Sequence, residues 1–279
     1  MVWSVLTREG LEQTKDQFAS SGYVMQWYAM GMEVVLTTLG PEWWKKNCTT
    51  EAIKPDEFLA VPDDSEKSKY NHQDRMVKLG HMLYALRECQ GYDAFISSLK
   101  TRDLAPTFFE LWVANILYQN NFIVEFVQAK GQKGEDYDLF AERDGISLSV
   151  EAKSRRAGIV LAKNKLRSTL ETARKQLPSS GPGIIFVSIP NDWTMDRNAE
   201  ELIGNCINSF FRNSARVNYV VLIWHQWLEL EKGRASASFV RQYENLSPRS
   251  QVELGKVIQP PTMPINLNAE QQDFTPSFW

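Results

Sequence analysis

The sequence predicts a mixed α/β fold, and three observations lead to that prediction. A turn signal at Asp144-Gly145 separates two segments of strand-forming composition, which predicts a β-hairpin. A basic segment follows in which apolar residues recur every three or four positions, as in an amphipathic helix. The continuous apolar run 184–189 then predicts a strand buried on both faces. Together these patterns indicate a mixed sheet flanked by helices.

The elements around the hairpin follow in a definite order. Pro106 can stand in the first turn of a helix whose apolar residues keep helical spacing over Phe108–Tyr118. The run 122–127 is expected to form a strand that precedes the hairpin. The basic helix is predicted over Leu161–Leu177, and Pro178 with the Ser- and Gly-rich run after it ends that helix. The predicted order is therefore helix, three strands, helix and strand.

The region before this core, residues 1–100, is expected to be helical. Helices are predicted over Tyr23–Leu39 and Tyr70–Cys89, both rich in large apolar residues, and an acidic, proline-containing loop over Thr49–Ser68 lies between them. The main interpretation is a helical appendage packed on the core. The alternative is a module for specificity, for homodimerisation or for binding a protein partner.

The core domain is expected to span 101–258 and to continue beyond the last strand named above. A helix is predicted over Ala199–Asn213, a strand over Tyr219–Trp227 and a second hairpin arm over Ala235–Tyr243. Residues 259–279 are expected to form a C-terminal tail. Its aromatic end either packs back on the domain or serves as a docking peptide.

The second arm of the central hairpin carries the most informative residues of the chain. Apolar and polar residues alternate over Ile146–Lys153, so Glu151 and Lys153 are expected on the same sheet face, away from the apolar row. The hairpin brings Asp138, on the neighbouring strand, within reach of Glu151. Two carboxylates and an ammonium group on one face suit a divalent metal and an activated water. The competing interpretation is the ordinary solvated face of a hairpin.

The order of elements, together with Glu110 on the preceding helix, Asp138 and Glu151-Ala152-Lys153, resembles the restriction endonuclease-like, or PD-(D/E)XK, nuclease superfamily. The resemblance covers roughly residues 106–190, and its motif is short and permissive. Tyr137 stands where the family name has proline, a position that varies widely in the family. The resemblance implies a restriction endonuclease-like core with metal-dependent phosphodiesterase activity.

Phosphodiester hydrolysis gives each of these residues an expected role. The substrate is anionic, so its hydrolysis needs charge neutralisation and a positioned nucleophile. Mg²⁺ or Mn²⁺ is the expected cofactor, with Asp138 and Glu151 as ligands and, as the resemblance implies, the backbone carbonyl of Ala152. Lys153 is expected to hold the attacking water or help deprotonate it. Glu110 either assists a second ion from its helix or faces solvent.

Two further polar residues are accessory candidates. Asp136 shares strand parity with Asp138 but lies nearer the loop after Gly134, so Asp138 is favoured as the ligand. Asp136 is then an accessory residue or a loop charge. Gln176 flanks the apolar stripe of the basic helix, and the resemblance implies that such a residue can reach the site.

A cluster of positive charge follows the hairpin, in a chain whose net charge is -3. Beside a metal site these side chains are expected to contact nucleic-acid phosphates, with DNA as the expected substrate. The alternative is an ordinary solvated helix face. The residues are Arg155, Arg156, Lys163, Lys165, Arg167 and Arg174.

The rest of the composition argues against other kinds of site. The three histidines lack metal-ligand spacing and the three cysteines lack a CxxC pair, which disfavours a zinc site and a disulfide scaffold and favours the cytoplasm. Glycine-rich nucleotide-binding motifs, a signal peptide and an apolar run of membrane-spanning length are not found. The sequence thus predicts a cytoplasmic, Mg²⁺- or Mn²⁺-dependent nuclease, either an endonuclease or an exonuclease. The alternatives are an RNA-cleaving defence or toxin effector and a non-catalytic nucleic-acid-binding module on a nuclease fold.

Overall fold

The computed structural model describes residues 6–48, 58–59, 66–132, 134–155, 161–195, 198–230, 233–250, 252 and 265–266 of the 279-residue chain. Six α-helices precede the first strand: α1 (Arg8–Gln17), α2 (Tyr23–Leu39), α3 (Pro41–Cys48), α4 (Glu66–Ala85), α5 (Tyr92–Leu99) and α6 (Leu104–Gln119). The strands are β1 (Ile123–Phe126), β2 (Leu139–Arg143), β3 (Ile146–Ser154), β4 (Gly183–Ser188), β5 (Val217–Leu230), β6 (Gly233–Glu244) and β7 (Ile265–Asn266). Between strands lie α7 (Lys163–Gln176), α8 (Asp192–Met195) and α9 (Ala199–Phe211).

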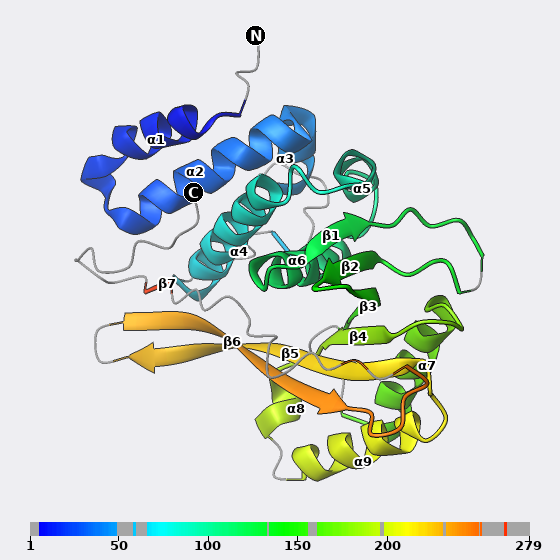
Figure 1. Ribbon diagram of the computed structural model, residues 1–279. Helices are drawn as coiled ribbons and strands as arrows, with labels where there is room; N and C mark the ends of the chain where they lie inside the picture. Colours follow the sequence, from blue (N-terminus) through cyan, green and yellow to red (C-terminus); the bar gives the residue numbers. More distant parts are fainter. Residues whose placement is uncertain are drawn as a thin grey trace.

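The seven strands of the described residues form one mixed sheet in the order of the chain, β1 to β7 (Figure 1). β1, β2 and β3 are antiparallel, β3, β4 and β5 are parallel, and β6 and β7 return antiparallel. The turn between β2 and β3 consists of Asp144 and Gly145, whose φ angles of 53° and 77° suit a two-residue hairpin turn. The predicted mixed α/β fold is confirmed, and α6-β1-β2-β3-α7-β4 has the predicted order.

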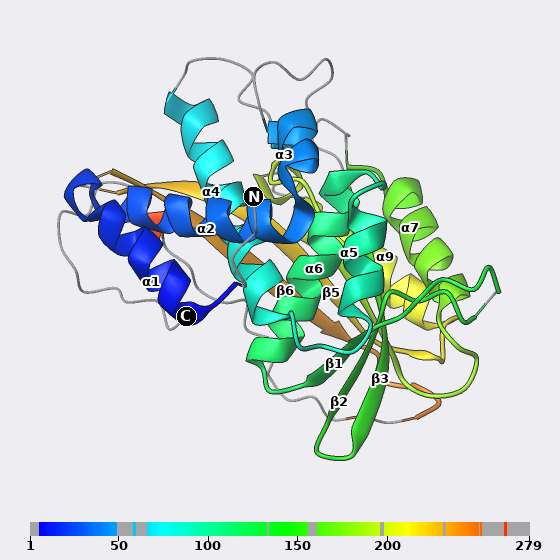
Figure 2. The ribbon, with the colours of Figure 1, turned by 90° about the horizontal axis from the view of Figure 1, so that it is seen from above.

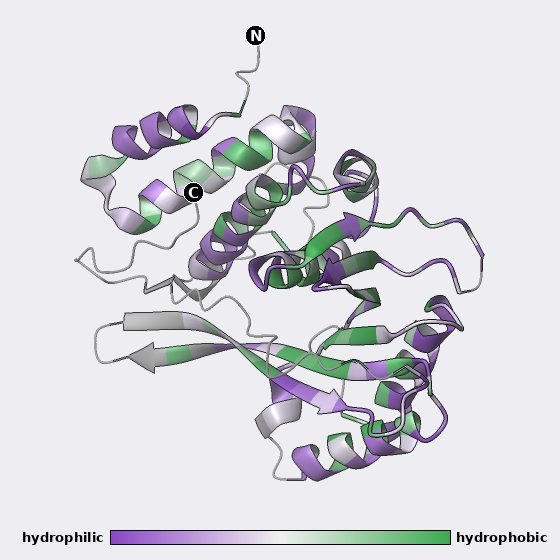
Figure 3. Ribbon diagram, viewed as in Figure 1, coloured by the Kyte–Doolittle hydropathy of each residue, from purple (hydrophilic) through white to green (hydrophobic). Residues whose placement is uncertain are grey.

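Helices cover both faces of the sheet, because both faces are apolar. On one face Val150 and Phe186 join the core that contains α6. On the other face Ile185 and Val187 pack with the apolar stripes of α7 and α9. β4 is buried along nearly its whole length, as the continuous apolar run predicts. Figure 3 shows hydrophobic residues along β1 and β4, whereas α1 is mainly hydrophilic.

The helical region before the sheet shares a core with it. Buried side chains of α2 and α4 belong to the same apolar cluster as those of α6 and the inner sheet face. The helices α2 and α4 approach closely where Gly80 meets Gly31, since a Cβ on Gly80 would lie 2.5 Å from the Gly31 Cα. Seen from above, α1, α2 and α4 lie over the outer part of the β5–β6 hairpin (Figure 2). There Lys78 bonds Ser236 across the boundary at 3.1 Å.

Several expectations were incomplete or fall outside the described residues. The helices α1, α3 and α5 were not predicted, and α1 buries a single residue, Leu11. Most of the expected loop over Thr49–Ser68 lies outside the described part of the chain, and so does the tail 259–279 except for β7. Among the described helices, none combines the length and apolarity needed to cross a membrane.

Candidate active site

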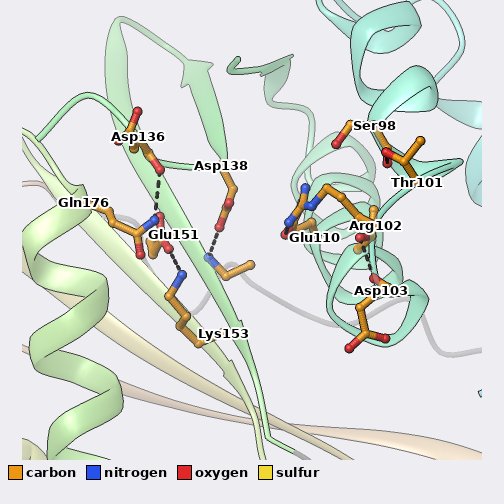
Figure 4. Close-up of polar contacts among 12 residues, drawn as sticks. Ser98, Thr101, Arg102, Asp103, Glu110, Asp136, Asp138, Glu151, Lys153 and Gln176 are labelled. Carbon is orange, nitrogen blue, oxygen red and sulfur yellow. Dashed lines mark hydrogen bonds and ion pairs between the residues drawn. The ribbon is translucent and has the colours of Figure 1, made fainter. Parts of the chain in front are cut away.

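The hairpin fixes Asp138 beside the end of β3. The Asp138 backbone donates to the Val150 carbonyl at 3.1 Å and accepts from the Val127 amide at 3.0 Å, which ties it to strands on both sides. Its side-chain Oδ2 accepts a hydrogen bond from the Ala152 amide at 2.8 Å. Asp138 is therefore held at one position between the two strands, with its carboxylate directed at the segment that carries Glu151 and Lys153 (Figure 4).

Glu151 and Lys153 share a sheet face, as predicted, but that face is not open to solvent. Glu151 is fully buried, and α7 packs against the side of β3 from which it projects. The Lys153 ammonium contacts Glu151 Oε1, and the lysine side chain is 25% exposed. Glu151 Oε2 is buried, and it has no hydrogen-bond partner among the residues that the structure describes. An unpartnered buried carboxylate oxygen is costly, so this atom calls for a cation or a proton.

Glu110 lies on α6, which packs on the sheet face opposite to α7, and it approaches Asp138 from that helix. It is 6% exposed, which rules out the alternative of a solvent-facing carboxylate. Both of its oxygens accept from Arg102, Oε2 at 2.8 Å and Oε1 at 2.5 Å. Arg102 stands in the short turn between α5 and α6, and its side chain is 44% exposed. Figure 4 shows Glu110 and Arg102 facing Asp138 across the site.

The carboxyl groups shift each other's acidity. Burial, and then the charge of Glu110, raises the pKa of Asp138 to about 7, while Lys153 opposes the shift. Burial, and then the charge of Asp138, raises the pKa of Glu151 to about 9. Carboxyl groups this close titrate as a coupled system and resist ionising together. A cation bound between them would relieve both the burial penalty and the mutual repulsion.

The stability of the metal-free protein is expected to fall as the pH rises from about 5 to about 9. The pKa values of Asp138 and Glu151 are higher in the folded chain than in the unfolded chain, so the folded chain binds more protons in this range. The protonated carboxyls therefore stabilise the fold at low pH, and this stabilisation is lost as the pH rises through the folded pKa values. Urea unfolding at pH 5, 7 and 9 measures the free energy of unfolding across this range. The Asp138→Asn variant, which lacks one of the groups, should lose less stability over the same range. A constant stability difference between variant and wild type would contradict the shifted carboxyls.

Arg102 is expected to compete with a divalent cation for Glu110. An Arg102→Gln variant should bind Mn²⁺ several-fold more tightly, because it removes a positive charge near three carboxylates and frees both Glu110 oxygens. Calorimetric titration with Mn²⁺ measures the affinity. Lys100→Gln is the matched control, since Lys100 is exposed and only two residues away. An equal gain in Mn²⁺ affinity in both variants would assign the effect to net charge and would contradict a competition between Arg102 and the cation for Glu110.

Asp136 and Gln176 lie at the rim of the site. Asp136 Oδ1 accepts from the amides of Lys130 and Gly131 at 2.7 and 2.9 Å, so its carboxylate organises the loop before β2. Gln176, in the last turn of α7, donates to the Asp136 carbonyl at 3.2 Å. Gln176 thus ties α7 to the loop that leads into Asp138, and Asp136 has the loop role that was one of its two expected roles.

The predicted basic residues are distributed over several places. Lys163, Lys165 and Arg167 are exposed on the first half of α7. Arg155 instead bonds the Lys165 carbonyl at 2.9 Å and the Thr169 hydroxyl, which fastens α7 to the end of β3. Arg174 pairs with Glu171 at 2.6 Å near the other end of α7. Arg156 lies outside the described residues.

Comparison with known proteins leaves the site to be interpreted from its own geometry. No protein-family model and no curated protein sequence matches the chain. Within the described residues, no group of three or more His, Cys, Asp or Glu side chains has an arrangement ready to hold a metal ion. Arg102 holds both oxygens of the third carboxylate, Glu110.

Proposed function

We propose that this chain is a divalent-metal-dependent nuclease, with DNA as its substrate. The observation that carries the proposal is the buried, unpartnered Oε2 of Glu151 beside Asp138 and the Lys153 ammonium. A carboxylate that contributes only to stability would have both oxygens paired or in solvent. Strongly raised carboxyl pKa values next to a lysine are typical of functional sites.

The donor set fits a hard divalent cation. Asp138 and Glu151 offer carboxylate oxygens, which Mg²⁺ and Mn²⁺ prefer, and such ions keep several waters when few protein ligands are present. When bound, the ion supplies charge neutralisation for the phosphodiester and acidifies a water. Glu110 becomes a further ligand only if Arg102 releases it.

The chain's own residues have distinct parts in the proposed reaction. Lys153, freed from Glu151 when the carboxylate turns to a cation, can donate a hydrogen bond to the attacking water or to a phosphate oxygen. Arg102 is half exposed and faces the carboxylates, so it can bind a phosphate oxygen of the substrate after leaving Glu110. Asp138 accepts a hydrogen bond from the Ala152 amide and donates one to the Val150 carbonyl, and these two bonds keep the site in place throughout.

A substrate panel tests the proposal. Purified protein is incubated with supercoiled, linear, branched and single-stranded DNA and with RNA, in Mg²⁺ or Mn²⁺, and in parallel with EDTA. Metal-dependent cleavage of DNA is the expected result. Cleavage of RNA alone would assign the site to an RNA-cleaving effector, and no cleavage of any substrate in either metal would contradict the proposal.

A further inference from the structure

A second group of positively charged residues lies at the start of β5. It is a cavity of about 740 Å³, called the arginine pocket here, formed where α7, α9 and the ends of β5 and β6 meet. Four arginines line it: Arg174, Arg212, Arg216 and Arg249. The only carboxylate among the lining residues is Glu244. Four guanidinium groups gathered in one cavity are unusual in a chain whose net charge is -3.

Three of these arginines are held in place by backbone carbonyls. Arg174 donates to the Asn213 carbonyl at 2.6 Å, Arg216 to the Leu177 carbonyl at 2.9 Å, and Arg249 to the Ser179 carbonyl at 2.7 Å. Each guanidinium has five N–H donors, so most donors of Arg216 and Arg249 remain available to a ligand. The side chains are therefore pre-ordered for an anion, at a lower entropy cost than mobile lysines would carry.

The wall of the pocket also contains an unsatisfied donor. Ser214 is 2% exposed, and within the described part of the chain its Oγ has no hydrogen-bond partner. The buried Asn245 fixes this part of the wall, because its side-chain amide donates to the carbonyls of Ser214 and Val217 at 3.3 and 2.8 Å. A rigid wall that carries guanidinium forks suits the oxygens of a phosphate group.

The arginine pocket shares Arg216 with a second cavity. This cavity measures about 550 Å³ and is also lined by Lys130 and Tyr137. Tyr137 directly precedes Asp138, and the loop from Lys130 is the one that Asp136 organises. Arg216 and the loop that leads into Asp138 therefore line one cavity, which also contains Glu135.

We propose that the arginine pocket binds the sugar-phosphate backbone of the nucleic acid that the carboxylate site would cleave. The identity of the ligand as a nucleic acid rests on the proposed function. In this proposal the main contacts with the nucleic-acid backbone are made by arginines that are distant in sequence, whereas the sequence analysis placed them on the basic residues of α7. Arg174 belongs to both sets. The pocket holds the nucleic acid, and the carboxylate site cleaves it.

The test compares two doubly neutralised variants of the full chain. Arg212→Ala/Arg249→Ala removes two exposed arginines of the pocket, and the Arg212 side chain makes no hydrogen bond or ion pair within the described part of the chain. Arg8→Ala/Lys46→Ala removes two exposed basic residues from α1 and α3 and is matched in charge. Affinity for fluorescein-labelled duplex and single-stranded DNA is measured by anisotropy in EDTA at several salt concentrations. In parallel, inorganic phosphate is tested for its effect on the melting temperature.

The pocket variant is expected to bind DNA at least about tenfold more weakly, and its log–log salt dependence should flatten by roughly two units, one per lost phosphate contact. The matched variant should bind like the wild type. Equal DNA affinity and equal salt dependence in the two variants would overturn the inference. It would also be overturned if inorganic phosphate raised the melting temperature only when the arginines are present, while DNA binding did not depend on them. DNA binding through the pocket without cleavage would contradict only the nuclease proposal. Cleavage with binding that is independent of these arginines would contradict only the pocket.

Discussion

An Asp138→Asn variant is expected to lose hydrolysis by on the order of 10³-fold, while its metal-free form melts at a higher temperature than the wild type. The amide has the size of the carboxylate and can still accept the hydrogen bond from the Ala152 backbone, so the fold is retained. The substitution removes one anionic ligand and also the charge that raises the pKa of Glu151. At pH 8 the loss of a buried like charge should stabilise the chain, and a gain of about 1 kcal/mol corresponds to roughly 2–4 °C.

The matched control for this variant is Asp136→Asn, two residues earlier. An asparagine Oδ1 can accept the same two hydrogen bonds from Lys130 and Gly131, so activity should stay within about threefold of the wild type. Cleavage assays and thermal melts of both variants provide the comparison. A similar loss of activity in both, or a lower melting temperature for metal-free Asp138→Asn, would contradict the assigned roles.

A Lys153→Ala variant is expected to lose on the order of 10²–10³-fold in kcat, with little change in DNA affinity. The side chain is 25% exposed, so its removal leaves only a small defect in the core. In the metal-free protein Glu151 loses its ammonium partner and can take up a proton in exchange, which limits the cost to folding. The cleavage step should suffer because no other described ammonium contacts Glu151.

Single-turnover cleavage measures the rate of the cleavage step, and anisotropy measures the DNA affinity, so the two effects are separated. Lys46→Ala, which removes an exposed lysine from α3, is the control and should leave both unchanged. If Lys153→Ala weakened binding and cleavage by the same factor, the lysine would be a binding residue instead. If cleavage were unaffected, the proposed role of Lys153 would be wrong.

The sequence predicted those elements whose signals are local. The alternation in β3 and the Asp144-Gly145 turn specify a hairpin by themselves, and the helix predicted over Tyr23–Leu39 has the bounds of α2. The helices that escaped prediction are short or weakly apolar. The eight-residue α3 and α5 are stabilised by contacts with the rest of the core more than by their own pattern.

The site was only partly predictable, because burial depends on the layers around the sheet. Alternation placed Glu151 and Lys153 on one face correctly, but it could not show that α7 packs against that face. Arg102 lies eight residues before Glu110, and no spacing rule links them, since the turn between α5 and α6 sets their contact. Arg212, Arg216 and Arg249 likewise meet only after β5 and β6 have paired.

The most direct test of the metal site is Mn²⁺ binding followed by electron paramagnetic resonance, which detects the free ion without requiring the substrate to be known. The wild-type chain should remove Mn²⁺ from solution at pH 8, Asp136→Asn should do so equally, and Asp138→Asn should bind far less. Absence of binding by the wild type, or equal binding by Asp138→Asn, would contradict the claim that Asp138 and Glu151 hold a divalent cation.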